Sequence, residues 1–257
     1  MADQHTPVAL VTGSSRGIGA AIARRLCAIG YHVAVNYLHS EQAALTLVEE
    51  LNTQGPRAIA VRADVSAHAG RSRLIGETIE NYGRIDVLVN NAGITSQGRL
   101  DLLKATEESW DKVFDTNLKG PFFISQMVAQ QMMNQPALHP NIIINMSSIS
   151  AYAISENRAD YCIAKAGLEV MTKLFATRLA DNGILVYEIC PGVIASDMTA
   201  PVKEKYNKLI DEGLSPIRRW GTGEDVATAV EILASGRLTF TTGERLNVDG
   251  GFPIRRL

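Results

Sequence analysis

The chain has 257 residues, 46% of them hydrophobic and 20% charged, and its 25 Lys and Arg against 27 Asp and Glu leave a formal net charge of −2. This balance excludes the strong positive potential of a nucleic-acid-binding protein. No apolar run approaches the roughly 20 residues that span a bilayer, and the polar start, 1–5, lacks the apolar core of a secretion signal. We therefore expect a globular cytoplasmic protein that contacts neither nucleic acid nor membrane.

Cysteine and histidine are too scattered for a disulfide framework or a metal site. Cys27, Cys162 and Cys190 lie far apart, as is typical of small buried hydrophobic side chains. The five histidines are equally dispersed: His5, His32, His39, His68 and His139. We expect no bound metal ion.

Short apolar runs alternate with longer amphipathic stretches along the chain. The runs predict seven strands, at 7–12, 32–37, 58–62, 85–90, 141–146, 185–189 and 245–248. The stretches predict helices at 17–29, 41–54, 71–82, 107–134, 160–181 and 224–234, and Thr222 and Asp225 predict a capping box before the last. Continuous apolar runs are typical of parallel strands that are buried on both faces.

This alternation predicts an α/β fold, a single domain at 1–257 with a Rossmann-type, doubly wound, parallel seven-stranded sheet and helices on both faces. The segment 196–216 interrupts the alternation after the sixth strand and contains Pro201 and Pro216. It follows the carboxyl edge of the sheet, where ligands bind in such folds. We expect a mobile lid there, with a plain surface excursion as the alternative.

The first strand leads into a Gly-rich loop, 12–19, and then an Ala-rich helix. Gly13 allows a tight turn, Gly17 leaves room for a pyrophosphate, and Gly19 lets the helix pack closely. The start of a helix also favours phosphate. The loop departs from the standard dinucleotide spacing, but its place between strand and helix predicts a nucleotide site.

The end of the second strand discriminates between two dinucleotides. Residues 36–40 contain no Asp or Glu, which would bind the ribose 2′-hydroxyl of NAD(H) and repel a 2′-phosphate. Arg16 could pair with that phosphate, and Asn36 and Ser40 could donate further hydrogen bonds. We expect a preference for NADP(H), with NAD(H) as the alternative.

Tyr161 and Lys165 stand four residues apart in a predicted helix, so their side chains share one face. A tyrosine hydroxyl has a pKa of about 10, and a neighbouring ammonium would lower it toward the working range of a base. Other polar residues are predicted at the same rim of the sheet: Ser147 and Ser148, Asn90 to Gly93, Asn117, Pro191 and Gly192. Taken singly, each could be structural, Ser148 as a strand-end cap and Tyr161 as core.

Together these residues resemble the classical short-chain dehydrogenase/reductase family over nearly the whole chain. The matching motifs are the Thr-Gly-x-x-x-Gly-x-Gly loop at 12–19, Asn-Asn-Ala-Gly at 90–93, and the tetrad Asn117, Ser148, Tyr161 and Lys165. The resemblance implies hydride transfer between C4 of a nicotinamide and a carbonyl or carbinol carbon.

The resemblance also implies roles for the tetrad. Ser148 would hydrogen-bond the substrate oxygen where negative charge develops, and Tyr161 would give or take the hydroxyl proton. Lys165 would hold the nicotinamide ribose and lower the pKa of Tyr161. The backbone carbonyl of Asn117, in a helix distortion, would hold a water that extends the proton relay.

Asp64 and Val65 match the family's adenine contact, and Pro191, Gly192 and Ser196 match the segment that holds the nicotinamide amide and phosphates. The full set expected to bind the cofactor is Gly13, Ser15, Arg16, Gly17, Ile18, Gly19, Asn36, Tyr37, Ser40, Asp64, Val65, Asn91, Ala92, Gly93, Tyr161, Lys165, Pro191, Gly192, Ile194 and Ser196. The Gly-rich loop, Arg16, Asn36 and Ser40 enter this set from the physical argument above, and the other members enter it from the resemblance.

Within the family the chain most resembles 3-oxoacyl-[acyl-carrier-protein] reductases. These usually carry basic residues near the end of the long helix before the fifth strand, and another on the catalytic helix, to meet the acidic carrier. Here 130–135 has no positive charge and Thr177 replaces the usual Arg, although Arg178 is adjacent. Lost charge pairs would weaken steering toward an acidic partner, so the substrate is either an acyl thioester or a small carbonyl compound.

Two alternative functions stay open. A dehydrogenase of a free sugar, polyol or other small alcohol needs no docking surface, and polar residues of the segment 196–216 would suit its substrate: Asp197, Thr199, Lys203 and Glu204. A non-catalytic NADP(H)-binding regulator could use the same fold, but it has no need of the intact tetrad.

Whichever of these functions holds, the resemblance implies a homotetramer in which 252–257 packs against a neighbouring subunit, with a disordered tail as the alternative.

Overall fold

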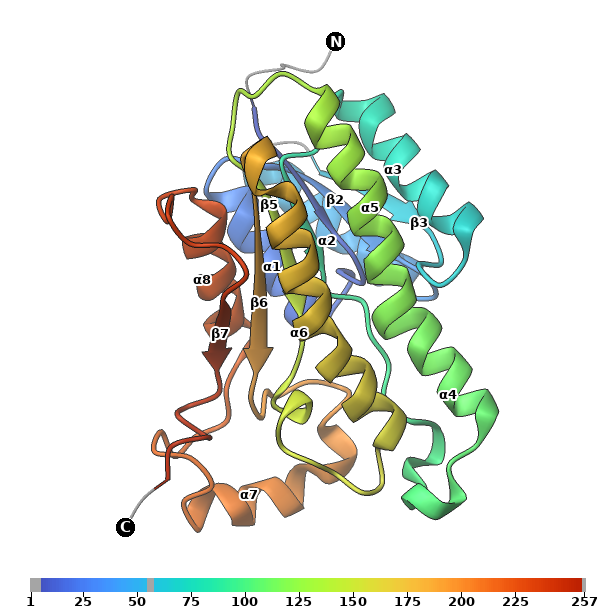
Figure 1. The fold of residues 1–257 in the computed structure, drawn as a ribbon, viewed down its shortest axis with the longest axis vertical. Coiled ribbons are helices and arrows are strands. Elements are labelled where there is room, and N and C mark those ends of the chain that lie inside the picture. The colour runs from blue at the N-terminus through green and yellow to red at the C-terminus, as the bar shows by residue number, and fades with distance from the viewer. Residues whose placement is uncertain (1–5, 55–57, 256–257) are drawn as a thin grey trace.

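The computed structural model describes residues 6–54 and 58–255. Seven parallel strands form one sheet in the order β3-β2-β1-β4-β5-β6-β7 (Figure 1). The strands are β1 (Val8–Val11), β2 (His32–Tyr37), β3 (Ala58–Arg62), β4 (Val87–Asn90), β5 (Asn141–Met146), β6 (Ile184–Pro191) and β7 (Arg245–Val248). The strand order reverses between β1 and β4, and such a switch point is where open α/β sheets bind ligands.

The helices are α1 (Gly17–Ala28), α2 (Glu41–Gln54), α3 (His68–Tyr82), α4 (Glu107–Phe114), α5 (Gly120–Asn134), α6 (Ala159–Leu179), α7 (Lys203–Asp211) and α8 (Gly223–Ala234). The predicted doubly wound parallel sheet is confirmed, and most predicted ends differ from these by three residues or fewer. The capping box is confirmed too, because the Thr222 and Asp225 side chains each accept a hydrogen bond from the other's backbone N–H.

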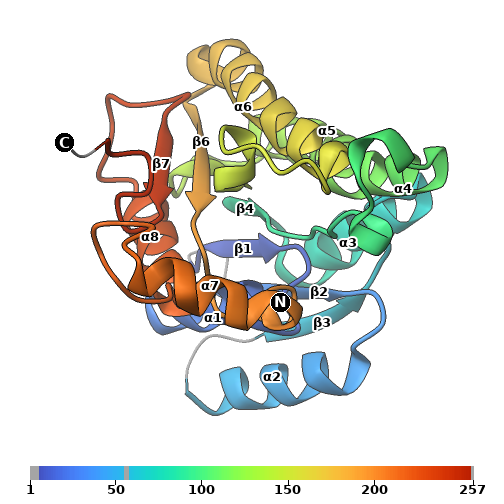
Figure 2. The same ribbon diagram turned by 90° about the horizontal axis from the view of Figure 1, so that it is seen from below.

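The sheet is the middle layer between two layers of helices (Figure 2). On one face, α1, α2 and α8 pack against side chains such as Ala9, Val33 and Val35. On the other, α3, α5 and α6 pack against Leu10 and Ala34. Successive strand residues point to opposite faces, so both faces are apolar and the polar residues concentrate at the strand ends.

The prediction of one regular helix at 107–134 is wrong. It is divided into α4, a π-helical turn at Asp115–Lys119, and α5. Pro121 supplies one cause, because it has no N–H to donate to the carbonyl of Asn117 in an α-helical pattern. Gly120 supplies another, since its backbone approaches the Val65 carbonyl so closely that an added Cβ would lie 2.8 Å from that oxygen.

The segment 196–216 contains a helix, α7, that the periodicity analysis did not predict. Its apolar residues Tyr206, Leu209 and Ile210 do have a helical spacing, but the helix has only nine residues and only Ile210 is buried. The segment lies beyond the carboxyl ends of the central strands (Figure 1). Within the described residues, no helix combines the length and the hydrophobicity needed to cross a membrane.

Candidate functional site

A cleft of about 510 Å³ lies at the carboxyl edge of the sheet, around the switch point between β1 and β4. Ligand pockets in proteins have volumes of roughly 300–1,000 Å³. Every residue of the expected cofactor set lines this cleft, and so does Ser148. Of the predicted site residues, Asn117 alone is fully buried behind the wall.

Glycines shape the part of the cleft formed by the loop 12–19. Gly13 has φ +60°, and a Cβ there would lie 2.8 Å from the Cα of Ala92. A Cβ on Gly19 would lie 2.5 Å from both the Asn91 amide nitrogen and the Gly13 carbonyl oxygen. Gly17, with φ +58°, has nothing within 4 Å of its Cβ position. The loop is thus closely packed at two glycines and open at the third.

The residues after β4 fasten this loop. The Asn91 amide donates to the carbonyls of Thr12 and Gly13 at 2.9 and 3.0 Å. The Thr12 hydroxyl accepts from the backbone N–H groups of Asn91 and Ala92, both at 2.9 Å. These bonds hold the loop 12–19 against β4.

Asn36 lines the cleft, but its side chain is committed to the protein's own backbone. Its carbonyl oxygen accepts from the Gly13 N–H at 2.9 Å, and its amide donates to the carbonyls of Val61 and Ala63 at 3.3 and 3.0 Å. The expectation that Asn36 donates to a 2′-phosphate is therefore corrected, because both amide hydrogens already have acceptors. Asn36 ties the Gly-rich loop to the ends of β2 and β3.

Arg16 pairs with Asp197 across the mouth of the cleft, at 3.3 Å between the guanidinium and the carboxylate. Both side chains are exposed, so this contact contributes little energy. It nevertheless connects the Gly-rich loop to the segment 196–216. A guanidinium held this loosely is free to exchange Asp197 for a phosphate.

Ser148, Tyr161 and Lys165 meet where β5 ends beside α6. Burial raises the pKa of Tyr161, while the hydrogen bond with Ser148 and the positive charges of Arg158 and Arg99 act in the opposite direction. The Lys165 ammonium donates to the Met146 carbonyl at 2.7 Å and lies 5.7 Å from the centre of the Tyr161 ring.

Burial lowers the pKa of Lys165 to about 8, although the negative charge of Glu188 opposes the shift. The expectation that Tyr161 has a lowered pKa because of Lys165 is corrected, because desolvation of the phenol dominates. At neutral pH the phenol is protonated, which suits a proton donor better than a base.

Asn117 lies in the π-helical turn and is fully buried. Its side-chain amide donates to the Ile94 carbonyl and accepts from the Ile94 N–H, both at 2.8 Å. These two bonds hold the chain after β4 against the helix. The Asn117 carbonyl lacks its α-helical donor because residue 121 is proline, which agrees with the expected helix distortion.

Two cationic residues near Tyr161 escaped the sequence analysis. Arg158 is the N-cap residue of α6 and its guanidinium carbon lies 5.4 Å from the centre of the Tyr161 ring. Its position three residues before Tyr161 is a local signal that could have found it. Arg99 comes from the loop after β4 and donates to the Met198 carbonyl at 3.1 Å, a contact between distant segments that no local pattern predicts.

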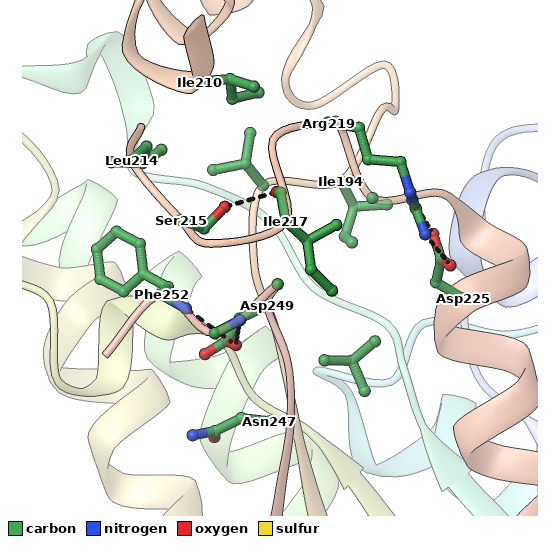
Figure 3. Close-up of a pocket in the computed structure, with 15 residues that line it drawn as sticks. Ile194, Ile210, Leu214, Ser215, Ile217, Arg219, Asp225, Asn247, Asp249 and Phe252 are labelled. Carbon is green, nitrogen blue, oxygen red and sulfur yellow. Dashed lines mark hydrogen bonds and ion pairs between the residues drawn. The ribbon is translucent and has the colours of Figure 1, made fainter. Parts of the chain in front are cut away.

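A second pocket, of about 290 Å³, lies behind the segment 196–216 and against the C-terminal residues (Figure 3). Figure 3 shows Ile210, Leu214 and Phe252 on one side of the view and the Arg219–Asp225 ion pair on the other. No tetrad residue lines it. In the described part of the chain, no group of three His, Cys, Asp or Glu side chains is placed to hold a metal ion.

A doubly wound sheet with a Gly-rich loop at its switch point and a Ser–Tyr–Lys group beside it defines a dinucleotide-dependent oxidoreductase. The chain belongs to the short-chain dehydrogenase/reductase family, and residues 13–253 match the family model described as Enoyl-(Acyl carrier protein) reductase. The protein is accordingly an oxidoreductase of the kind that acts on CH–OH groups.

Similar proteins cover almost the whole chain. The 3-oxoacyl-[acyl-carrier-protein] reductase FabG of Staphylococcus epidermidis is 41% identical over 243 residues, which are 95% of this chain and 97% of that protein. The crystal structure of a 3-oxoacyl-[acyl-carrier protein] reductase from Brucella melitensis in complex with NAD has a TM-score of 0.93 and 39% identity, covering 98% of this chain and 99% of that one. A short-chain dehydrogenase/reductase from Serratia marcescens has a TM-score of 0.88 and 30% identity, covering 96% and 98%.

Proposed function

We propose that the protein reduces a carbonyl group, or oxidises the corresponding secondary alcohol, with a nicotinamide cofactor, and that 3-oxoacyl thioesters are its first candidate substrates. The observation that carries this proposal is the meeting of Ser148, Tyr161 and Lys165 at one end of a cleft whose other end is the Gly-rich loop. The names of the relatives from Staphylococcus and Brucella support the acyl substrate.

The residues of the cleft fit a dinucleotide. Gly17 presents open space at the start of α1, where backbone N–H groups favour a phosphate. Asp64 and Val65 line the cleft at the end of β3, where we expect the adenine. The relative in complex with NAD supports a nicotinamide cofactor, which when bound supplies or accepts the hydride.

The residues of the tetrad protonate and hydrogen-bond the substrate oxygen in the proposed reaction. Tyr161 donates the proton that this oxygen needs during reduction, and the Ser148 hydroxyl hydrogen-bonds the same oxygen as negative charge develops. Lys165 adds a buried positive charge beside the phenol. Asn117 keeps the chain after β4 and the π-helical turn in register with these groups.

The state of Lys165 gives a pH dependence. Because burial lowers its pKa to about 8, the ammonium is present below that pH and lost above it. We expect kcat/KM for carbonyl reduction to be flat at neutral pH and to fall as pH rises through about 8, measured between pH 6 and 10. In Lys165→Arg, whose guanidinium stays charged, the residual activity should lack this fall. An identical fall in the variant would contradict the assignment to Lys165.

Arg16 carries the proposed preference for NADP(H). Removing the guanidinium in Arg16→Leu should weaken NADPH binding about tenfold, the worth of a charge-assisted hydrogen bond of about 1.5 kcal/mol, and should leave NADH binding nearly unchanged. Asp197→Asn is the matched variant: it frees Arg16 and should favour NADPH. Dissociation constants from cofactor fluorescence test both, and an unchanged NADPH-to-NADH ratio in Arg16→Leu would rule out this role.

Substrate assays distinguish the open functions. Purified protein with NADPH is offered acetoacetyl-CoA and, in parallel, a panel of keto-sugars. Fast oxidation of NADPH with the thioester supports a 3-oxoacyl reductase, despite the missing docking charges on α5 and α6. Turnover of a keto-sugar alone supports the sugar or polyol dehydrogenase, and cofactor binding without any turnover supports the regulator.

A homotetramer, a lid and a cytoplasmic location complete the proposal. Ile163, Val170 and Leu174 expose 48%, 60% and 60% of their surface along α6, an apolar face that a second copy of the chain would cover. Val170→Glu should lower the sedimentation coefficient if this face is an interface.

The contacts of Arg16 and Arg99 with the segment 196–216 support a lid that closes on the cleft. None of the three cysteines forms a disulfide bond in the described structure, as is usual in a reducing compartment.

A further inference from the structure

Positive charge gathers at the end of the cleft where Tyr161 lies. Arg158, Arg99 and Lys112 come from α6, from the loop after β4 and from α4, and all three line the cleft. None of them forms an ion pair with a described residue. Arg158 donates only to the hydroxyl groups of Ser150 and Ser155, so its charge is not compensated by a carboxylate.

The carboxylates near this end of the cleft form hydrogen bonds or ion pairs with other residues. The Asp64 carboxylate accepts from the Ser66 backbone and hydroxyl, and Asp197 pairs with Arg16. Asp160, two residues after Arg158, is buried outside the cleft lining, and its carboxylate accepts from the Ser109 hydroxyl at 2.5 Å and from Ser96. Asp160 has no cationic partner among the described residues either, but it lies behind the lining, so the lining of the cleft itself carries more positive than negative side chains.

The backbone at Arg99 is strained. It has φ +48° and is the one described residue other than glycine with a positive φ. This left-handed conformation is unfavourable for a residue with a Cβ, and such residues concentrate at active sites and ligand-binding sites. It turns Arg99 toward the Met198 carbonyl, and its charge, like that of Arg158, acts on the Tyr161 phenol.

We propose that Arg158 and Arg99 hold an acid group of the substrate, a carboxylate or a phosphate, while the carbonyl to be reduced lies at Ser148 and Tyr161. The inference rests on the proposed oxidoreductase function, and it replaces the first candidate substrate, a 3-oxoacyl thioester, with an oxo acid or an oxo phosphate. Planar guanidinium groups match such anions with paired hydrogen bonds. A simple aliphatic 3-oxoacyl thioester is neutral around its carbonyl and leaves both arginines unmatched.

Matched substrates test the proposal. Acetoacetate is compared with its neutral methyl ester, and a ketose phosphate with its free ketose, so that the two pairs separate a carboxylate from a phosphate. The charged member of one pair should have at least tenfold higher kcat/KM. Arg158→Met should abolish that preference through KM, and Arg158→Lys should partly restore it. Arg178→Met, at the exposed far end of the same helix, should change nothing.

The outcomes separate this inference from the proposed function. Equal or better turnover of the ester or of acetoacetyl-CoA in the wild type would overturn the acid-group site and leave the oxidoreductase function standing. If no carbonyl is reduced, the proposed function fails. The acid-group site is then tested by the binding of small anions. Malonate or inorganic phosphate should then raise the wild-type Tm, less so in Arg158→Met, and still in Arg16→Leu. A Tm shift unchanged in Arg158→Met would overturn the inference.

Discussion

Tyr161→Phe should lower the turnover number by about two to four orders of magnitude, the usual worth of a positioned general acid, with cofactor affinity nearly unchanged. The substitution removes only the hydroxyl, and the ring keeps its packing against Val113 and Ala164. The structure gives the hydroxyl one hydrogen-bonding neighbour in the tetrad, Ser148. Without the phenol, neither Ser148 nor Lys165 can deliver the proton to the substrate oxygen in its place.

Steady-state assays with NADPH and the best carbonyl of the panel measure this loss, and cofactor fluorescence measures the affinity. Tyr31→Phe is the matched control, because it removes another buried phenol, one that donates to the Ala234 carbonyl at 2.8 Å. It should cost about 1 kcal/mol of unfolding free energy and leave turnover unchanged. A Tyr161→Phe enzyme that retains a tenth of wild-type turnover would refute the proton-donor role.

Gly19→Ala should weaken cofactor binding by about 10- to 100-fold. The added Cβ would lie 2.5 Å from the Asn91 amide nitrogen and from the Gly13 carbonyl oxygen, and 2.7 Å from the Cα of Ser14. Two of these neighbours are backbone, so the loop 12–19 must move. Overpacking of this kind costs about 1–3 kcal/mol, and the displaced loop is the part of the cleft that is expected to hold the phosphates.

Gly76→Ala supplies the control for this substitution. Gly76 lies within α3, and its Cβ position has nothing within 4 Å. There the same change should stabilise the protein by up to about 1 kcal/mol, since alanine is the better helix former, and it should leave cofactor affinity unchanged. Calorimetric titration of both variants with NADPH gives the comparison. Equal affinities would show that the close packing at Gly19 has no bearing on the cofactor.

Much of the fold follows from the sequence because parallel strands buried on both faces are continuous apolar runs. The predicted ranges of the buried strands β2 and β5 agree with the structure to the residue, and so do those of the partly exposed edge strands β3 and β7. Periodicity alone did not predict the π-helical turn at Asp115–Lys119; only the family resemblance implied a distortion at Asn117. One cause, Pro121, is local, but the other is the close contact of Gly120 with Val65, which belongs to another part of the chain. The helical spacing of Tyr206, Leu209 and Ile210 in α7 was overlooked, because the helix is short and is surrounded by charged residues.

The site was predictable to the extent that it depends on strand ends. Residues that follow β1, β4, β5 and β6 meet at one edge of the sheet, so their grouping in the cleft follows from strand order alone. What each side chain binds did not follow. The Asn36 amide donates hydrogen bonds to backbone carbonyls. Burial, and not Lys165, has the largest effect on the pKa of Tyr161. Hydrogen-bond partners and pKa values depend on distances and desolvation, and the spacing of residues in a sequence does not contain these.

The most direct test of the account is the transfer of the hydride itself. The protein is incubated with NADPH deuterated at both C4 positions and with the carbonyl substrate that the panel selects, and the alcohol product is analysed by mass spectrometry. One deuterium should appear on the carbinol carbon for each NADPH oxidised, and with Tyr161→Phe the rate of this transfer should be lower by about two to four orders of magnitude. If the cofactor binds but no deuterium reaches any carbonyl of the panel, the protein is a binding module and the account of the site is contradicted.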